Sequence, residues 1–420
     1  MSNISMSERI VLKSFIGKTI PLEKLCISIV DCPHSTPKWS EDGLIVVRNF
    51  NIKNGSLDLS NPSYTDKDSF DERIKRAKPE SGDIIITREA PMGQVCMIPE
   101  GVECCLGQRM VLIKVDTKKI TSEYLLFALQ SEFVQKQIKK SDKTGSIVSN
   151  LCIPDLKALE IPVLDNPVAL ASILKSVIDK IDLNNRINAE LESMAKTLYD
   201  YWFVQFDFPD ANGKPYKTSG GKMVYNATLK RDIPAGWEVK TLSQIANITM
   251  GQSPAGESYN EDGIGTLFYQ GSTDFGWLFP APRQYTTSPA RMAKKGDILL
   301  SVRAPVGDMN IANADCCIGR GLAALNSKTG SDGFLFYVMK YFKQVFERRN
   351  SEGTTFGSIT KDDLHSLSVV YPQSALLKKY DNIVSDYNKM IFVRSLENRD
   401  LAKLRDWILP LLMNGQAIVK

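Results

Sequence analysis

The residue types that most often carry metal or nucleophilic chemistry are scarce in this chain. Its 420 residues include only two histidines, His34 and His365, and eight cysteines, none of them spaced C-x-x-C. Adjacent cysteines such as Cys104 and Cys105 make poor corners for a zinc site. Two histidines also leave little scope for a Ser-His-Asp or Cys-His centre. These counts argue against a metalloprotein and against a histidine-based hydrolase.

Phosphate-binding and acid–base motifs are incomplete as well. The letters GKT at residues 17–19 resemble the end of a Walker A loop, but residue 12 is leucine where that loop needs glycine. No G-x-G-x-x-G loop follows an expected strand, and no Asn-Pro-Pro-aromatic sequence of the kind used for amino methylation occurs. Asp83 and Asp297 each follow a glycine at a strand entrance, where an aspartate usually bonds its own turn. We therefore expect a chain that binds rather than catalyses, with no cofactor or metal of its own.

Composition indicates an ordinary globular protein. The net charge is +4, hydrophobic residues make up 43% of the chain and charged residues 24%. The longest clearly apolar run, residues 334–339, is far shorter than the roughly 20 residues of a membrane-spanning helix, and no signal peptide is visible. Eight cysteines are too sparse for a disulfide scaffold, so the reduced cytoplasm is the expected location.

An internal repeat organises the chain. The sequence GDIIITREAPMG at residues 82–93 returns as GDILLSVRAPVG at residues 296–307, and CCLG at residues 104–107 returns as CCIG at residues 316–319. The matches keep their order along the chain, as expected of a tandem duplication. Within each copy, short apolar runs that end in turns predict strands, and helices are predicted over residues 122–137 and 334–348. Each copy is therefore predicted to be an α+β domain of about 150 residues.

A long heptad pattern follows each copy. Apolar residues alternate four and three apart from Leu170 to Trp202, and again from Leu376 to Leu411. This spacing predicts a coiled-coil seam on two helices, each about 50 Å long at roughly 1.5 Å per residue. The alternative is that both helices merely complete a globular core.

Polar residues in the seams predict the orientation of the two helices. An antiparallel pair places Asn184 opposite Glu397 and Asn188 opposite Arg394, so that polar groups meet polar groups. A parallel pair would leave polar groups desolvated, at roughly 1–3 kcal/mol each. We therefore predict an antiparallel pair.

The predicted fold class is α+β, with two tandem mixed α/β domains joined by two long antiparallel coiled-coil helices and related by a pseudo-two-fold. The predicted boundaries place the first domain at residues 1–166 and its helix at 167–208. A glycine- and proline-rich linker follows at 209–234, then the second domain at 235–372 and its helix at 373–420.

The helices and their flanks are similar to those of a known family. Residues 181–192 (IDLNNRINAELE) and 194–208 (MAKTLYDYWFVQFDF) resemble the central conserved region of the DNA-specificity subunit of type I restriction–modification systems. Residues 404–415 (LRDWILPLLMNG) resemble its C-terminal conserved region. The resemblance covers nearly the whole chain. It implies two variable target-recognition domains, each reading one half of a bipartite asymmetric DNA target, with the helix length setting the unread spacer.

The resemblance also implies partners. The chain is expected to bind double-stranded DNA, to hold two adenine methyltransferase subunits, and to recruit restriction/translocase subunits, with no membrane involved. S-adenosylmethionine, ATP and Mg²⁺ would be carried by those partner subunits. The helices would form the docking surface, because apolar residues beside the seams need cover. These flanking residues are Ile173, Ile178, Ile187, Met194 and Tyr201.

Candidate DNA-reading residues follow from the repeat. Base edges would be read in the major groove by polar side chains on loops, and phosphate contacts would fix the register. Arg48 and Asn49 follow a predicted strand, and Tyr269 with Gln270 occupy the equivalent place in the second copy. The other candidates, in turns and loops of the two copies, are Arg88, Gln108, Arg109, Lys143, Ser146, Arg303, Arg320, Thr354 and Thr355. For each candidate the alternative is a solvated surface or turn residue.

Three further interpretations accompany these predictions. Trp39 and Trp277 are expected to pack in the core or against loops rather than to form stacking platforms. The chain as a whole has two alternative functions: a DNA methyltransferase or nuclease whose motifs have diverged beyond reading, or an adaptor that binds only proteins. Methyl transfer by the purified chain alone would favour the enzyme, and salt-sensitive binding to duplex DNA would argue against the adaptor.

Overall fold

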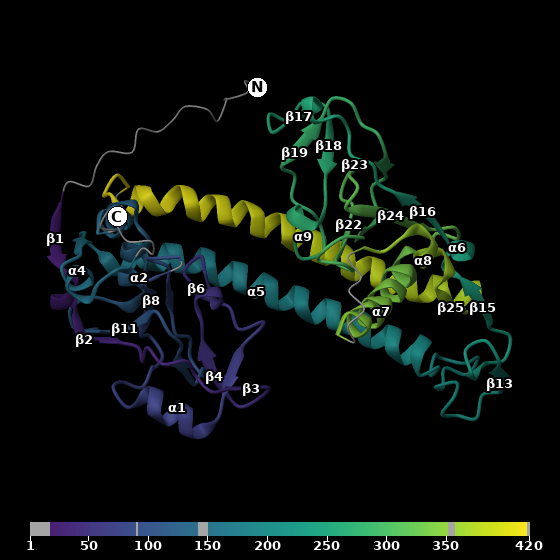
Figure 1. Cartoon of the computed structure of the whole chain (residues 1–420), viewed down its shortest axis with the longest axis horizontal. Coiled ribbons are helices and arrows are strands. Elements are labelled where there is room, and N and C mark those ends of the chain that lie inside the picture. The colour runs from purple at the N-terminus through teal and green to yellow at the C-terminus, as the bar shows by residue number, and fades with distance from the viewer. Residues whose placement is uncertain (1–16, 90, 142–149, 352–357, 418–420) are drawn as a thin grey trace. The chain divides into compact units, whose positions relative to one another are not determined.

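The computed structural model describes residues 17–89, 91–141, 150–351 and 358–417, and these residues fall into two compact α+β units (Figure 1). Unit 1 comprises residues 1–181 and 400–420, and unit 2 comprises residues 182–399. The long helices α5 (Pro167–Tyr199) and α9 (Ser374–Met413) each contribute to both units. The helices therefore pack with the domains rather than forming a separate body.

Unit 1 is built around two four-stranded sheets. The first has the strand order β2-β11-β8-β9 and is antiparallel, whereas the second has the order β10-β4-β7-β3 with β10 and β4 parallel. Strands β1 and β12 form a separate antiparallel pair, as do β5 and β6. The strands are β1 Lys18–Pro21, β2 Cys26–Asp31, β3 Trp39–Ser40, β4 Leu44–Val47, β5 Ile52–Lys53, β6 Ser56–Leu57, β7 Ser63–Thr65, β8 Ile84–Thr87, β9 Val95–Met97, β10 Cys104–Leu106, β11 Met110–Val115 and β12 Glu160–Val163. The helices are α1 Lys67–Ile74, α2 Ser122–Gln130, α3 Glu132–Lys140 and α4 Ile153–Lys157.

Unit 2 repeats this topology. Its antiparallel sheet has the order β16-β24-β21-β22, and its second sheet has the order β17-β19-β18-β23-β20 with β18 and β23 parallel. Strands β15 and β25 pair as β1 and β12 do. The strands are β13 Met223–Asn226, β14 Arg231–Pro234, β15 Glu238–Thr241, β16 Ala246–Met250, β17 Tyr259–Asn260, β18 Thr266–Tyr269, β19 Gln284–Thr286, β20 Met292–Ala293, β21 Ile298–Ser301, β22 Met309–Ile311, β23 Cys316–Ile318, β24 Leu322–Ser327 and β25 Ser368–Tyr371. The helices are α6 Leu242–Ile245, α7 Asp332–Ser351 and α8 Lys361–Ser366. The predicted duplication and fold class are confirmed.

The repeated Gly-Asp strand separates two cores in each unit. Successive side chains of a strand point to opposite faces of its sheet. In β8, Ile84 and Ile86 therefore join the core that includes the helices, whereas Ile85 joins the core shared with β4 and β10. In β21, Ile298 and Leu299 divide in the same way between two cores. The antiparallel sheet is thus the middle layer of each unit, with helices on one face and the second sheet on the other.

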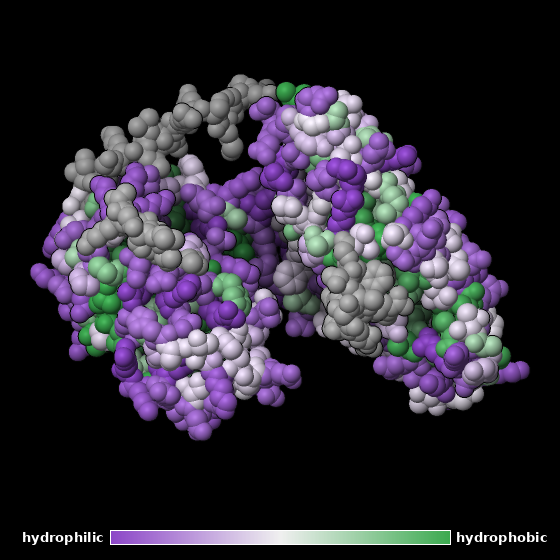
Figure 2. Space-filling model, viewed as in Figure 1, coloured by the Kyte–Doolittle hydropathy of each residue, from purple (hydrophilic) through white to green (hydrophobic). Residues whose placement is uncertain are grey.

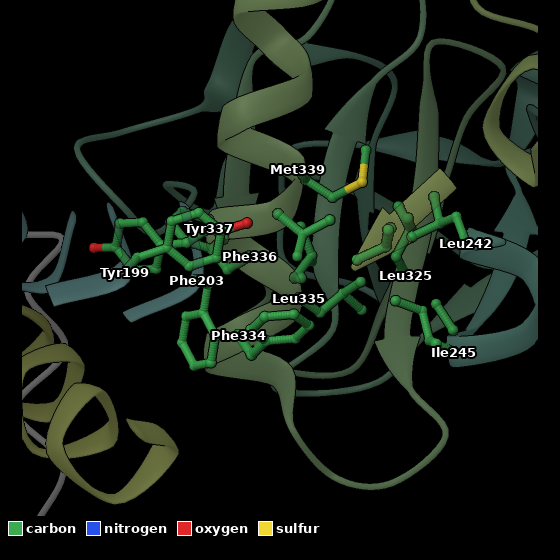
Figure 3. Close-up of a cluster of buried hydrophobic side chains, with 14 of the residues drawn as sticks. Tyr199, Phe203, Leu242, Ile245, Leu325, Phe334, Leu335, Phe336, Tyr337 and Met339 are labelled. Carbon is green, nitrogen blue, oxygen red and sulfur yellow. The ribbon is translucent and has the colours of Figure 1, made fainter. Parts of the chain in front are cut away.

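Aromatic packing holds the helical layer of unit 2 together (Figure 3). The α5 helix continues into a π-helical turn, Asp200–Val204, which presents Phe203 to the core. The ring of Phe203 lies 4.8 Å from that of Phe334 on α7 and 5.1 Å from that of Tyr380 on α9. Edge-to-face pairs of this kind stabilise by about 0.5–1.5 kcal/mol beyond their buried area. The second domain therefore folds directly onto both long helices.

The antiparallel pairing of α5 and α9 is confirmed within unit 2. Asn184 Nδ2 donates to Glu397 Oε2 at 2.8 Å, and the Tyr380 hydroxyl donates to the carbonyl of Ala195 at 3.1 Å. Residue numbers rise along α5 as they fall along α9, so the helices run in opposite directions. In unit 1, Leu170 packs in the same core as Leu412.

The predicted seam of α9 is wrong by about one position over part of its length. Val384 and Ile391 are buried, whereas Met390 and Leu404, which the heptad count placed in the seam, are exposed. That Asn188 lies opposite Arg394 stays a prediction, and Asn188 is buried. The Arg394 guanidinium donates to the carbonyl of Met390 on its own helix.

Two local predictions also differ from the structure. The helix predicted over residues 122–137 is broken at Ser131, which has an extended backbone and caps α3 through its hydroxyl, an acceptor for the amide of Val134. The predicted linker contains the hairpin of β13 and β14, in addition to the turns that its glycines and prolines indicated. Within the described residues, every helix is too short or too polar to span a lipid bilayer.

Replacement of the buried asparagine should destabilise unit 2. Asn184→Ala removes two hydrogen bonds that a buried amide donates, to the side chains of Glu397 and Asn398. We expect the free energy of unfolding in urea to fall by about 1–3 kcal/mol. Glu190→Ala, an exposed position on the same helix, is the matched control. Equal stability of the two variants would contradict a structural role for this polar seam.

Candidate nucleic-acid interface

The parallel strand pair in each unit brings two loops to one edge of a sheet. Val47 pairs with Leu106 at the ends of β4 and β10, and the amide of Gly107 donates to the carbonyl of Val47 at 2.8 Å. In unit 2, Tyr269 pairs with Ile318, and the amide of Gly319 donates to the carbonyl of Tyr269, again at 2.8 Å. Because parallel strands end at the same edge, the residues that follow them are neighbours. We call the residues that follow these strands, from Arg48 and Gly107 in unit 1 and from Gln270 and Gly319 in unit 2, the strand-end cluster of each unit.

The strand register determines which residues of the two clusters are equivalent. Val47 corresponds to Tyr269, so Arg48 corresponds to Gln270 and not to Tyr269 as the sequence comparison predicted. On the second strand of each pair, Gly107 corresponds to Gly319, and the next residue, Gln108, therefore corresponds to Arg320.

The turn after the central strand joins this edge in both units. The amide of Arg88 donates to the carbonyl of Arg109 at 2.8 Å, and the amide of Val302 donates to that of Gly321 at 2.9 Å. Arg88 therefore corresponds to Val302, and Arg303 takes the place of Glu89. The one-residue displacement between Arg88 and Arg303 is confirmed, and the two arginines do not occupy equivalent positions.

Arg48 is displayed on an aromatic pair. Its guanidinium carbon lies 4.9 Å from the ring centroid of Trp39 and 4.9 Å from that of Phe50. All three residues are exposed, and Trp39 retains 46% of its accessible surface. Among the described residues, no carboxylate forms an ion pair with Arg48. Stacking on two rings restrains the guanidinium plane and leaves its hydrogen-bond donors at the edge available.

The remaining candidates of unit 1 near this edge are more constrained. Gln108 Nε2 donates to the carbonyl of His34 at 2.5 Å, Asn49 Nδ2 donates to that of Glu89 at 2.7 Å, and Arg109 Nε lies 3.1 Å from the Glu89 carboxylate. More than half of the Arg109 side chain stays accessible despite this pair. The structure thus brings Arg48, Asn49, Gln108 and Arg109, which were predicted as separate candidates, to one edge of the sheet.

Arg88 has a structural environment instead. Its side chain is about nine-tenths buried, and it donates to the carbonyl of Leu151 at 2.9 Å, to Asp31 at 2.7 Å and to Asn150 at 3.2 Å. These acceptors occupy the guanidinium, so Arg88 anchors the segment around residue 151 to the central sheet. This geometry disfavours the predicted contact with DNA.

Unit 2 presents a different set of side chains at the same edge. Gln270 is exposed, and its amide bonds the hydroxyl of Ser253 through both its nitrogen, at 2.9 Å, and its oxygen, at 3.1 Å. Arg303 and Arg320 are exposed. Tyr269 is buried in the core beneath them, where burial raises the pKa of its hydroxyl, so it does not reach the surface. The prediction that Tyr269 contacts DNA is therefore wrong.

Some residues near the clusters were not predicted, and some predicted residues do not lie in the clusters. Trp39 and Trp277 are exposed rather than packed in the core, and the indole of Trp277 donates to Glu192 at 3.0 Å. Trp39, Phe50 and Ser253 are new members of the clusters. The predicted loop residues Lys143, Ser146, Thr354 and Thr355 lie outside the described residues.

A cavity in unit 2 offers little net positive charge to an anionic ligand. Unit 2 has a cavity of about 840 Å³ beside α5 and α7, but two of its lysines are paired, Lys196 with Asp200 and Lys343 with Asp308. Its positive charges are therefore largely neutralised. In the view of Figure 2, hydrophobic residues form only small patches on a mostly hydrophilic surface.

No metal or nucleophilic centre is evident among the described residues, which contain no group of three His, Cys, Asp or Glu side chains able to hold a metal ion. Burial raises the pKa of Cys104 and of Cys316 to about 12, so these thiols stay protonated at neutral pH. Both lie in strands that form the core, and their environment is that of packing residues.

The predicted docking residues are partly exposed. Met194 and Tyr201 are exposed in unit 2, and Ile173 is exposed in unit 1. Ile187 and Ile178 are partly buried against the cores of their units. A further exposed residue, Leu183, continues at helical spacing the stripe of Ile187 and Met194 on α5 and Tyr201 in the π-helical turn that follows it. This stripe is an apolar surface that lies beside the seam, and we call it the α5 stripe.

The fold is duplicated, its two strand ends carry basic and amide side chains, and one helix carries an apolar stripe. These features define a two-copy recognition protein. Comparisons with known proteins agree. Residues 36–193 and 234–391 each match the type I restriction modification DNA specificity domain. Each match runs from the sheets of one copy into the long helix that follows it. The chain therefore belongs to the type I restriction–modification DNA specificity family. Its role is to recognise DNA sequence, as the non-catalytic specificity component of such a system.

Individual relatives support this assignment. The MjaX type I restriction enzyme specificity subunit of Methanocaldococcus jannaschii is 33% identical over 402 residues, which cover 92% of this chain and 90% of that protein. The HindI specificity subunit of Haemophilus influenzae is 22% identical over 404 residues, which cover 80% of this chain and 87% of that protein. A crystal structure of the type I restriction–modification system S subunit from M. genitalium has the same fold, with a TM-score of 0.59, 16% identity, and coverage of 97% of this chain and 98% of that chain.

Loss of Arg88 should affect stability rather than base preference. Arg88→Ala removes three hydrogen bonds and leaves Asp31 partly buried without its guanidinium partner. We expect the free energy of unfolding of the full chain to fall by about 2–4 kcal/mol. The matched control is Arg76→Ala, at an exposed arginine of the same unit. A stable Arg88→Ala protein with altered base preference would show that Arg88 reads DNA after all.

Proposed function

We propose that each unit reads one half of a bipartite, asymmetric DNA target through its strand-end cluster. The proposal rests on one observation: the two units share the same backbone arrangement at this edge but carry different side chains on it. The same parallel strands end at the same edge in both units, yet Arg48 and Gln108 stand where Gln270 and Arg320 stand in the other unit. Equal scaffolds with unequal surfaces are suited to reading two unequal half-sites.

We propose direct base reading in the major groove by these exposed side chains. Arginine forms two hydrogen bonds with guanine, and glutamine forms two with adenine. Arg303 and Arg109, which border the clusters, are placed to contact phosphates or further bases. The stacked guanidinium of Arg48 is the most strongly preorganised of the set, because two rings restrain it before DNA arrives.

We propose that α5 and α9 dock two adenine methyltransferase subunits. These subunits would bring S-adenosylmethionine, and restriction/translocase subunits that use ATP and Mg²⁺ would join the same complex. The exposed α5 stripe supports this proposal, because an apolar helical surface calls for a protein partner. We place the assembly in the cytoplasm, where it meets DNA.

Removal of the Arg48 side chain should weaken specific binding selectively. We expect Arg48→Ala, in the assembled complex, to bind the cognate duplex about tenfold more weakly while binding to random duplex changes much less. Fluorescence anisotropy at several salt concentrations would measure both affinities, and the slope of affinity against salt would report phosphate contacts. Arg186→Ala, on the exposed face of α5, controls for the lost charge. Equal losses on both duplexes would show that Arg48 contacts only the backbone.

A charge in the α5 stripe should prevent assembly with the methyltransferase. Met194→Glu places a carboxylate in a surface that is half-exposed in the free chain and would be buried on docking. We expect co-purification of the methyltransferase subunit to fall at least tenfold, with an unchanged unfolding temperature. Ala189→Glu, exposed on α5 but off the stripe, is the matched control. Normal assembly of the Met194→Glu chain would place the docking surface elsewhere.

A further inference from the structure

The two strand-end clusters hold the same two residue types in exchanged places. We define slot A as the position after β4 or β18 and slot B as the second position after β10 or β23. Slot A holds Arg48 in unit 1 and Gln270 in unit 2, whereas slot B holds Gln108 in unit 1 and Arg320 in unit 2. A contiguous sequence comparison does not show this exchange, because it emerges only when the strand registers align the two units.

The two slots are neighbours in each unit. In unit 2 the hydroxyl of Ser253 bonds the amide group of Gln270 in slot A and also accepts from the backbone amide of Arg320 in slot B, at 3.3 Å. A Cβ atom on Gly319, between the strands, would lie 2.9 Å from the Cα of Gln270. Glycine at this position therefore allows the two slots to approach.

The corresponding loop position borders the slots of unit 1. The amide of Cys32 donates to the carbonyl of Met110, just as the amide of Gly251 donates to that of Leu322, so His34 corresponds to Ser253. The carbonyl of His34 accepts from Gln108 in slot B. The same loop position thus orients a glutamine in both units, although the glutamine occupies slot B in one and slot A in the other.

The groups that read bases remain available in all four slots. The Arg48 guanidinium lies over the rings of Trp39 and Phe50 and has no ion-pair partner among the described residues. The Gln108 amide nitrogen donates to the carbonyl of His34 at 2.5 Å and to the hydroxyl of Thr36 at 3.4 Å. A base would replace the longer bond to Thr36, so Gln108 can offer one amide hydrogen together with its oxygen. Gln270 and Arg320 are exposed. Each side chain can therefore present two hydrogen-bonding groups to one base.

We propose that the two units read a guanine and an adenine at adjacent base pairs, in opposite order. Arginine would select guanine and glutamine adenine, so that slot A takes guanine and slot B adenine in unit 1, and the reverse holds in unit 2. Adjacent strands lie roughly 4.8 Å apart and adjacent base pairs about 3.4 Å apart, so the long side chains of the two slots need to converge by only about 1.4 Å to reach one base-pair step. This inference rests on the proposed function and names the bases at the centre of each half-site.

The flanking positions are not exchanged, so the proposal applies only to the two slots. Glu89 and Arg109 form an ion pair in unit 1, whereas Arg303 and Gly321 hold their places in unit 2. The two half-sites should therefore differ at the base pairs beside the shared step. This difference keeps the whole target asymmetric even though the central step uses the same two residue types.

In vitro selection from a random duplex library tests the proposal. The assembled complex would be compared with two exchanged forms, Arg48→Gln with Gln108→Arg, and Gln270→Arg with Arg320→Gln. Each exchange should reverse the guanine–adenine order in one half-site, with base preferences changing roughly tenfold, and should leave the other half-site unchanged. Because all four side chains are at the edge of a sheet, we expect both forms to fold, which urea unfolding would verify.

A milder variant and a control complete the experiment. Arg48→Lys keeps the positive charge but cannot donate two parallel hydrogen bonds to one base. The preference for guanine in one half-site should therefore fall, while the overall affinity changes little. Arg186→Gln, on α5, should change no base preference. Folded exchange forms that select the original bases, or no bases at the central step, would overturn the inference. If the unaltered complex selects no motif at all, the proposed function itself fails.

Discussion

The parallel pairing of β4 with β10, and of β18 with β23, is the constraint on which the proposed recognition surface depends. Antiparallel neighbours would send the two following loops to opposite edges of the sheet. Parallel neighbours bring them together, and the short glycine contact beside each pair lets their side chains converge. The edge therefore has a fixed backbone on which residue identity can change without a change of fold.

The middle sheet makes that edge rigid. Strand β8 packs Ile84 and Ile86 against the helices and Ile85 against the second sheet, and β21 does the same with its own alternating side chains. Arg88 anchors a later segment to the end of β8, so the turn beside the cluster is fixed as well. Because the helical layer includes α5 and α9, the core that supports the strand-end clusters also holds the helix that carries the α5 stripe in place.

Much of this architecture could be predicted from the sequence, because duplication and heptad spacing are signals that do not depend on exact register. The strands after Gly82 and Gly296, the antiparallel helices and the contact between Asn184 and Glu397 all followed from such patterns. The errors arose where one residue of register matters. Tyr269 precedes the surface by one position and is buried, and Met390 stands one position outside the seam that Ile391 fills.

Tertiary contacts decide what local patterns leave open. Nothing near Arg88 in the sequence indicates that a carbonyl 63 residues later accepts its hydrogen bond. In the same way, the stacking of Arg48 depends on Trp39, a residue from another strand whose exposure could not be inferred from its apolar character. The exchange of arginine and glutamine between the two units became visible only through strand pairing.

The most direct measurement is genome-wide mapping of methylated adenine in cells that express this chain together with its methyltransferase subunit. Two unlike recognition surfaces on one chain predict a single bipartite motif, with two different half-sites separated by a spacer of constant length. A continuous motif, two identical half-sites, or methylation that does not depend on this chain would contradict the assignment of one half-site to each unit.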